Sequence, residues 1–296
     1  MQTASREIIY NYHSPLNPPQ FTVKPGEVFM AETELCTGGW LLSYADSWTP
    51  DKTCALNPTV VVAVEGAKPG DVLAVKIHEV NPVEVGYTGF NKESNHLANH
   101  IMVHDWGMNV KTVKIEDGFV LWDDKRKLPV APMIGTLGTA PAVEALSNAK
   151  GGAHGGNMDV QEVAPGSTVY LPVAVEGALL HIGDCHAIQG DGEINCSGGI
   201  ECRTVCKLSV EVIKKPENYG CVRIENDAYI MTVVCEGNTK EAFLEATKQL
   251  VLWMVEGYGF TVNDAYLLLG QVMEARSTQF VNPTASYICK MPKKFL

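Results

Sequence analysis

Residues 183–193, with the sequence GDCHAIQGDGE, hold the densest group of chemically active side chains in this 296-residue chain. If a β-strand continues to His186, alternation places Asp184 and His186 on one face and Cys185 on the other. A carboxylate oxygen and an imidazole nitrogen are ligands that suit zinc, iron or manganese. The pair therefore indicates half of a metal site, although an Asp–His hydrogen bond at a strand end fits the same spacing.

A glycine-rich loop with further carboxylates follows this pair. Gly190 and Gly192 flank Asp191, which opens backbone conformations that other residues rarely adopt. The loop also carries Glu193, and Glu201 follows in the motif GGIE. A carboxylate near a metal-activated water can accept its proton, so these side chains are candidates for acid–base catalysis. An isolated Asp-Gly-Glu segment is also typical of a solvated turn.

A second glycine-rich segment, GGAHGGNMD at residues 151–159, surrounds His154 with four glycines and continues to Asn157 and Asp159. Such a segment is typical of a mobile surface loop, but it also permits close approach of the backbone to a ligand. Asp159 is therefore a candidate third metal ligand.

Three histidines, His96, His100 and His104, have the i, i+4, i+8 spacing of one helix face. No Glu-x-x-His motif accompanies them, so packed or exposed histidines are the favoured interpretation.

Four cysteines, Cys185, Cys196, Cys202 and Cys206, lie close together in the sequence but lack Cys-x-x-Cys spacing. A four-cysteine zinc site is therefore disfavoured. Buried, inert thiols are the favoured interpretation, and a cysteine nucleophile with a histidine base is the alternative. The chain also lacks a Gly-x-Ser-x-Gly nucleophile motif.

The elements that must position these residues are mainly strands. Residues 60–64, 72–77, 168–175 and 178–182 are short, rich in β-branched side chains and bounded by turn residues. This pattern predicts a sandwich- or barrel-like β core. The hexapeptide VAVEGA occurs twice, at 62–67 and 173–178, which indicates either two similar β halves or reuse of a common turn. We expect one unit over 1–296, with two β subdomains at about 1–130 and 131–296 as an option.

The last third of the chain has helical periodicity. Apolar residues in 238–260 recur at helical spacing, with Thr239 as the expected N-cap and glycines at the end. The sequence pattern of residues 261–281 predicts a second helix that starts near Asn263 or Asp264. The expected fold class is thus α+β and β-rich, with a C-terminal helical hairpin.

The charge and hydropathy of the chain disfavour some kinds of binding partner. The net charge of −11 disfavours nucleic acid and anionic membranes, and no stretch reaches the roughly 18 apolar residues of a membrane span. The N-terminus lacks the apolar core of a secretion signal, and there are nine cysteines. We therefore expect a cytoplasmic protein with reduced thiols.

Several of these motifs together resemble the acetamidase/formamidase family. The residues that carry the resemblance are PMIGTLGTAPA (132–142), GGAHGGNMD (151–159), the long segment 165–193 and GGIE (198–201), with 64–77 and 263–272 also similar. The resemblance implies a β-rich fold with helices, and hydrolysis of the C–N bond of a formamide- or acetamide-like substrate to carboxylate and ammonia. It also implies a divalent metal, with zinc favoured.

The residues of the family motif map here to Asn157, Asp159, Asp184, His186, Gln189, Asp191, Glu193 and Glu201, and we assign roles to them as a hypothesis. Asp184, His186 and Asp159 are the expected metal ligands, and Glu201 is the next candidate ligand. Glu193 is the expected general base.

Three further assignments concern the substrate and a second cation. Asp191 shares the catalytic role with Glu193 and Glu201 or holds a second cation such as Ca²⁺. Asn157, Gln189 and His154 are the expected substrate-binding residues.

Three alternatives remain open at this point. One is a hydrolase of a cyclic amide, lactam or urea-like compound, and another is a cysteine-dependent amidase that uses Cys185 or Cys196. A third is a non-catalytic β protein that binds a small ligand. A homodimer or higher homo-oligomer is the default expectation for an enzyme of this size.

Overall fold

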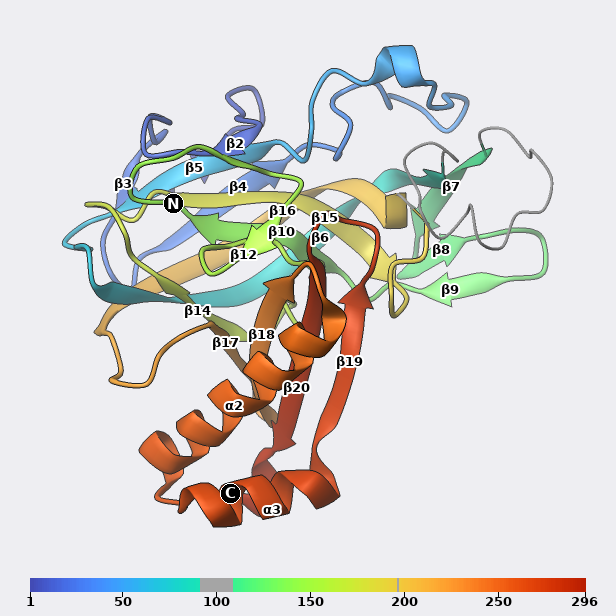
Figure 1. Cartoon of the computed structure of the whole chain (residues 1–296). Helices are drawn as coiled ribbons and strands as arrows, with labels where there is room; N and C mark the ends of the chain where they lie inside the picture. Colours follow the sequence, from blue (N-terminus) through green and yellow to red (C-terminus); the bar gives the residue numbers. More distant parts are fainter. Residues whose placement is uncertain (91–108, 196) are drawn as a thin grey trace.

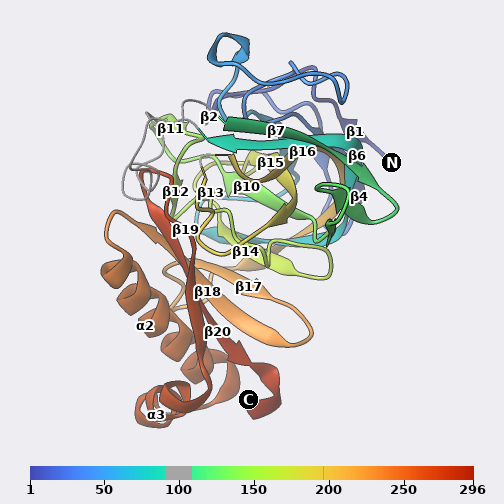
Figure 2. The same ribbon diagram turned by 90° about the vertical axis from the view of Figure 1, so that its right-hand side faces the viewer.

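The structure, a computed structural model, describes residues 1–90, 109–195 and 197–296. Its dominant element is one 18-stranded sheet that curls into a half-barrel (Figures 1 and 2). The strands of this sheet are β1 (Thr3–Ala4), β3 (Thr22–Val23), β4 (Val28–Thr33), β5 (Thr59–Val64), β6 (Asp71–Phe90), β7 (Asn109–Glu116), β8 (Phe119–Leu121), β9 (Lys127–Pro129), β10 (Met133–Thr139), β12 (Gly151–Gly152), β13 (Gly155–Asn157), β14 (Thr168–Pro172), β15 (Leu180–Gln189), β16 (Ser197–Lys214), β17 (Val222–Glu225), β18 (Tyr229–Glu236), β19 (Glu274–Gln279) and β20 (Ala285–Pro292). Two short strands, β2 (Tyr12–His13) and β11 (Leu146–Ser147), pair separately. The predicted β-rich fold is confirmed.

The predicted strands at 60–64 and 72–77 lie in β5 and β6. Every residue of β5 is buried, which explains its nearly continuous run of valines. The strand predicted at 178–182 begins later, at Leu180, because Ala178 and Leu179 have φ angles of 57° and 50° and belong to a turn. The strand then continues to Gln189 and carries the chemically active segment into the centre of the sheet.

Strands from both halves of the chain pair with one another. β5 pairs with β15, and β6 pairs with β14 and β16. The two VAVEGA copies meet at this seam: Val64 N–H donates to the Gly177 carbonyl at 2.9 Å, and Gly177 N–H donates to the Ala67 carbonyl at 2.9 Å. The main hydrophobic core lies inside the curl and takes side chains from both halves.

The expected helical hairpin is present at the C-terminal end. It consists of α2 (Thr239–Tyr258) and α3 (Val262–Val272), and it packs against β18 and β20 (Figure 1). The predicted N-cap, Thr239, is wrong: Asn238 caps α2, because its side chain accepts hydrogen bonds from the N–H groups of Lys240 and Glu241. Gly259 ends the helix in the left-handed region, with φ 74°.

The second helix is shorter than predicted and starts earlier. Thr261, rather than Asn263 or Asp264, caps it by accepting from the Asp264 N–H, and the helix ends at Val272. Met273 is extended, and the following residues form β19, which pairs with β20. Pairing with a sheet edge that comes later in the chain therefore overrides the local helical pattern in Glu274–Gln279.

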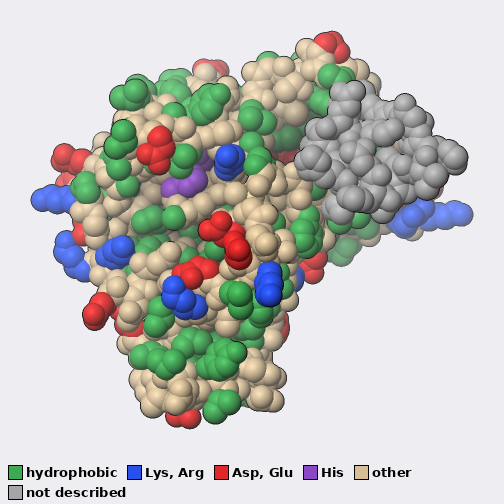
Figure 3. Space-filling model, in the orientation of Figure 1, with side chains coloured by type: hydrophobic (Ala, Val, Ile, Leu, Met, Phe, Trp, Pro, Cys, Tyr) green, Lys and Arg blue, Asp and Glu red, His purple; other side chains and the backbone are tan. Residues whose placement is uncertain are grey.

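The outer surface of the hairpin carries apolar side chains, including the exposed Leu244, Tyr266 and Leu267, and Figure 3 shows hydrophobic side chains gathered at this end of the molecule. None of the helices in the described ranges combines the length and hydropathy needed to cross a membrane. The three histidines His96, His100 and His104 lie outside the described residues.

The N-cap assignment gives a first prediction. Replacing Asn238 by Ala should lower the free energy of unfolding by about 1 kcal/mol, because two N–H groups of α2 lose their acceptor. Chemical denaturation followed by circular dichroism measures the change. Thr239→Ala is the control and should change stability by no more than about 0.5 kcal/mol. A larger loss for Thr239→Ala than for Asn238→Ala would restore the cap expected from the sequence.

Candidate active site

Strand β15 pairs first with β5 and then with β16, and the change of partner falls at the centre of the site. Its first residues pair with β5 as far as Gly183, and His186 pairs with Glu201 on β16. Asp184 lies between these two pairings and has φ 52°, a conformation that non-glycine residues rarely adopt. The local change in backbone direction places Asp184 where the sheet opens.

Asp184 and His186 lie on the same side of β15, as alternation predicts. His186 Nε2 is 3.6 Å from Asp184 Oδ1 and 3.3 Å from Glu201 Oε1. Cys185 points the other way into the main core, where its Sγ is 3.8 Å from the Cys206 Sγ. All described cysteines are free thiols.

Gln189 fixes the orientation and tautomer of His186. Its Nε2 donates to the carbonyls of Asp159 and Thr278, at 2.9 and 3.2 Å, which turns its Oε1 toward His186. Because Oε1 can only accept, His186 Nδ1 carries a hydrogen and donates to it at 2.8 Å. When His186 is neutral, as in a histidine metal ligand, its Nε2 lone pair therefore faces the carboxylates. Gln189 was expected to bind substrate, but here it positions His186.

Asp159 and Glu193 form a second group with His186. One potential ligand atom from each lies within 4.8 Å of the others, and all three side chains are buried. Asp159 and Glu193 have φ angles of 48° and 43°, so both carboxylates are held by uncommon backbone conformations. Asn282 Nδ2 donates to Asp159 Oδ2 at 2.7 Å.

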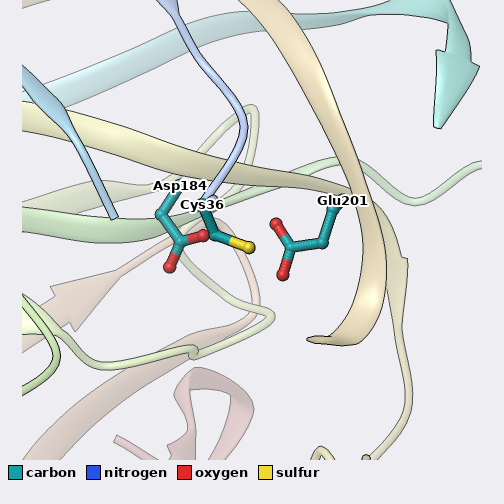
Figure 4. Close-up of side chains that lie close together, drawn as sticks. All are labelled: Cys36, Asp184 and Glu201. Carbon is teal, nitrogen blue, oxygen red and sulfur yellow. The ribbon is translucent and has the colours of Figure 1, made fainter. Parts of the chain in front are cut away.

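Cys36 forms a third part of the site that the sequence did not indicate. It lies in the loop after β4, and its Sγ is within 4.8 Å of carboxylate oxygens of Asp184 and Glu201. Figure 4 shows these three side chains directed toward one another. The loop precedes β15 by about half the chain, and no local spacing in the sequence connects the two.

The buried charges shift one another's protonation. Burial and the nearby Asp184 raise the pKa of Asp159 to about 7. Burial also raises the pKa of Glu193 and Glu201 above the ordinary value, with Asp159 and Asp184 as the main repelling neighbours. Burial alone would lower the pKa of His186, but Glu201 and Asp184 raise it well above its usual value. The cluster thus holds more negative charge than its protein surroundings neutralise.

The same cluster contains unused ligand atoms. Asp184 Oδ1, His186 Nε2, Glu193 Oε2 and Glu201 Oε2 are buried and form no hydrogen bond within the described part of the chain. Buried polar atoms are almost always satisfied, so this convergence requires a partner. Carboxylate oxygens and an imidazole nitrogen with excess negative charge fit a divalent cation such as zinc.

Asn157, on β13, positions two of the carboxylates. With its amide turned so that both of its polar atoms are satisfied, Nδ2 donates to Asp184 Oδ2 at 2.8 Å and to Asp159 Oδ1 at 3.2 Å. Its Oδ1 accepts from Nδ2 of Asn57 and of Asn282, each at 2.9 Å. The amide therefore holds the two acids in place. Asn157 also lines the cavity beside these residues, and its role in substrate binding stays a prediction.

A cavity of about 480 Å³ opens onto these residues. Asp184, Glu193, Glu201 and Cys36 reach it from one side. Its other walls combine apolar and amide side chains, among them Trp48, Leu56, Asn57, Phe90, Val281 and Asn282. An acidic cluster beside a partly apolar cavity suits a small, uncharged polar substrate.

Two residues expected in the site lie elsewhere. The Asp191 carboxylate is 65% exposed and forms an ion pair with Arg276 at 2.7 Å, because the glycine loop turns it outward. The imidazole of His154 packs edge-on against His13, with ring centroids 4.9 Å apart, and His13 stacks on His181 at 4.4 Å. His154 therefore belongs to a histidine cluster and is not among the described residues that line the cavity.

Glycines allow the strands to approach the cluster closely. A Cβ at Gly199 would lie 2.7 Å from Cγ and Nδ1 of His186, and a Cβ at Gly135 would lie 2.5 Å from Asp159 Oδ1. Only a residue without a side chain fits at either position. Gly199 lies in GGIE and Gly135 in PMIGTLGTAPA, so the motifs contained this signal although neither residue was singled out.

Comparison with known proteins agrees with the site. A model of the Acetamidase/Formamidase family matches residues 1–152 and 142–295. The acetamidase of Mycolicibacterium smegmatis is 27% identical over 344 residues, which covers 88% of this chain and 84% of that protein.

Solved structures show the same fold. An acetamidase from Bacillus halodurans matches with a TM-score of 0.92 and 28% identity, covering 99% of this chain and 98% of that one. A recombinant predicted acetamidase/formamidase from Thermoanaerobacter tengcongensis matches with a TM-score of 0.91 and 32% identity, covering 100% and 96%.

The fold and these relatives define an amidase, an enzyme that hydrolyses carbon–nitrogen bonds other than peptide bonds. The chain belongs to the acetamidase/formamidase family.

The close approach of Gly199 to His186 gives a second prediction. Gly199→Ala should reduce kcat/KM for amide hydrolysis by on the order of 100-fold, because the new methyl group must displace the imidazole. Gly190→Ala is the matched control, since a Cβ there meets nothing within 4 Å, and it should keep activity within about twofold. Equal activities for the two variants would show that the position of His186 does not matter.

The role of Gln189 gives a third prediction. Gln189→Leu should lower activity by roughly 10–100-fold, because His186 loses the acceptor that fixes its Nδ1 hydrogen. Gln161→Leu applies the same change at a partly exposed site beside Asp191 and should have little effect. Steady-state kinetics measures the loss, and thermal unfolding separates it from loss of fold. Wild-type kinetics in a folded Gln189→Leu protein would contradict the assignment.

Proposed function

We propose that this amidase hydrolyses a small, formamide- or acetamide-like amide with the help of a divalent cation, with zinc the favoured ion. One observation carries the proposal: Asp184, Glu193 and Glu201 line one cavity with buried, unsatisfied oxygens, and the unsatisfied Nε2 of His186 lies 3.6 Å from Asp184 Oδ1 and 3.3 Å from Glu201 Oε1. The relatives' printed names, acetamidase and formamidase, support the substrate class.

His186 and Asp184 are the proposed ligands, as expected from the sequence. Glu201 Oε1 lies 3.3 Å from His186 Nε2, which favours Glu201 as the third ligand. Asp159, the third ligand expected from the sequence, groups instead with His186 and Glu193, and one potential ligand atom of each lies within 4.8 Å of the others. A second cation at Asp159 and Glu193 would replace the role of Glu193 as a base, and the exposed Asp191 is paired with Arg276 instead.

An amide resists hydrolysis because resonance stabilises its C–N bond and because ammonia leaves poorly. A bound divalent cation supplies a Lewis acid for the carbonyl oxygen and lowers the pKa of water. Glu193 borders the cavity and has a raised pKa, so it is the proposed base that takes a proton from the attacking water. The same carboxyl group then delivers that proton to the departing nitrogen.

The alternatives are less well supported. Cys185, one proposed nucleophile, lies in the main core beside Cys206, and Cys196 lies outside the described residues. A cyclic amide remains the alternative substrate, since the cavity of about 480 Å³ exceeds the needs of formamide. Cytoplasmic location and a homo-oligomeric state stay predictions.

A fourth prediction tests the cation and the ligands together. Removal of divalent ions with a chelator should abolish ammonia release from formamide or acetamide, and added Zn²⁺ should restore it. Asp184→Asn and His186→Gln should each lower kcat/KM by on the order of 1,000-fold and reduce bound metal, as expected when a catalytic ligand is lost.

Asp191→Asn is the control for that series, because its carboxylate faces solvent and Arg276. It should retain metal and activity within about threefold. Ammonia release is followed across a panel of linear and cyclic amides, and metal content is measured on each folded protein. Full activity in a chelated wild type would overturn the proposed role of the cation.

A further inference from the structure

Cys36 is the one sulfur that borders the cavity among the described residues. Its Sγ and carboxylate oxygens of Asp184 and Glu201 all lie within 4.8 Å of one another (Figure 4). The side chains of Asp184 and Glu201 are only 3% exposed. Asp184 Oδ1 and Glu201 Oε2 in this group lack hydrogen bonds. Three side chains that can each carry negative charge thus face one another, and two of them have an unused atom.

We propose that Cys36 is a thiolate ligand of the catalytic cation, together with Asp184 and Glu201. This inference rests on the proposed function and deepens it, because a sulfur ligand selects the kind of ion. Thiolates bind Zn²⁺ and Co²⁺ well, whereas Ca²⁺ and Mg²⁺ prefer oxygen ligands. The site at Cys36 is therefore expected to take a zinc-like ion and to discriminate against calcium.

A chain of hydrogen bonds behind Cys36 supports the ligand role. The Trp40 indole, which can only donate, donates to Thr37 Oγ1 at 2.8 Å. The Thr37 hydroxyl is then free to donate to the Tyr87 hydroxyl at 2.8 Å, and Tyr87 to donate to Cys36 Sγ at 3.0 Å. Tyr87 is buried, and its ring packs edge-on against Trp40 at 4.8 Å.

The direction of these hydrogen bonds determines what can lie between the Cys36 sulfur and the carboxylates of Asp184 and Glu201. With Tyr87 as the donor, the sulfur of Cys36 accepts a hydrogen bond, and the carboxylates of Asp184 and Glu201 can only accept when ionised. A positive group between sulfur and carboxylates, either a proton or a cation, must therefore hold the three together. Donors behind a metal-bound atom are a regular feature of metal sites, because they orient the ligand and stabilise its charge.

The surroundings argue against a nucleophilic Cys36. Reactive cysteines are activated by a nearby positive charge, a helix N-terminus or a histidine base. The described residues that line the cavity include no Lys, Arg or His. His186 Nε2 is already directed between Asp184 and Glu201. The same carboxylates that disfavour a free thiolate favour a cation bound to it.

Cobalt substitution tests the proposal directly. The metal-free protein is loaded with Co²⁺, and its absorption spectrum is recorded. A thiolate bound to Co²⁺ gives an intense near-ultraviolet charge-transfer band that oxygen and nitrogen ligands do not give. We expect this band in the wild type and its loss in Cys36→Ser, together with roughly 10–100-fold weaker Zn²⁺ binding in a competition titration.

Two further variants keep the result interpretable. Cys54→Ser is the control, because Cys54 is an exposed thiol in the same N-terminal region, and the band and the Zn²⁺ affinity should be unchanged. Tyr87→Phe keeps the ring but removes the donor to Cys36, so the band should remain and shift in energy. If Cys36→Ser does not fold, as judged by circular dichroism, Tyr87→Phe still tests the ligand role.

The outcomes separate this inference from the proposed function. Stoichiometric Co²⁺ binding with amidase activity but no charge-transfer band would overturn the role of Cys36 and leave the proposed function intact. No binding of Zn²⁺ or Co²⁺ by an enzyme that stays active with chelator would overturn the proposed function itself. Stoichiometric alkylation of Cys36 by iodoacetamide in the metal-loaded enzyme, with loss of activity, would show a nucleophile in place of a ligand.

Discussion

Repulsion between buried carboxylates is the constraint on which the rest of this structure depends. Asp159, Asp184, Glu193 and Glu201 are all at least 96% buried and share one histidine. Two like charges about 4 Å apart repel by about 4 kcal/mol at an effective dielectric constant of about 20. A fold that brings four such groups together must hold them rigidly and must offer them a shared positive charge, whether protons or a metal ion.

The rigidity comes from backbone and amide groups that each serve two partners. Gln189 ties His186 to two backbone carbonyls, and Asn157 joins Asp159 to Asp184. The left-handed backbone at Asp159, Asp184 and Glu193 is unfavourable by itself, and at Asp184 the pairing of β15 with β10 and β16 maintains it. These unfavourable backbone conformations lower the stability of the fold but fix the positions of the acidic side chains, which is a common feature of enzyme active sites.

Patterns within short segments of the sequence correctly predicted the features that depend on neighbouring residues. Alternation along one strand placed Asp184 and His186 together, and helical spacing located the hairpin. Contacts with residues far away in the sequence determined the features that these patterns did not predict. Arg276 draws Asp191 to the surface, and β20 converts Glu274–Gln279 from helix to strand.

The same limit explains the side chains that sequence reasoning missed or misassigned. Cys36 and Asn282 reach the site from opposite ends of the chain, and no spacing could reveal them. Asn157 and Gln189 were singled out by the motif, and only their hydrogen bonds show that they hold other residues in place.

The pairing of β4, β5 and β6 with strands from the second half has a consequence for how the protein is made. During synthesis, these early strands leave the ribosome long before β14, β15 and β16 exist to cover them. Contacts between distant segments form slowly, and unpaired hydrophobic edges associate with other chains. Until the second half of the chain is made, the nascent first half therefore exposes unpaired strand edges that favour association with other chains.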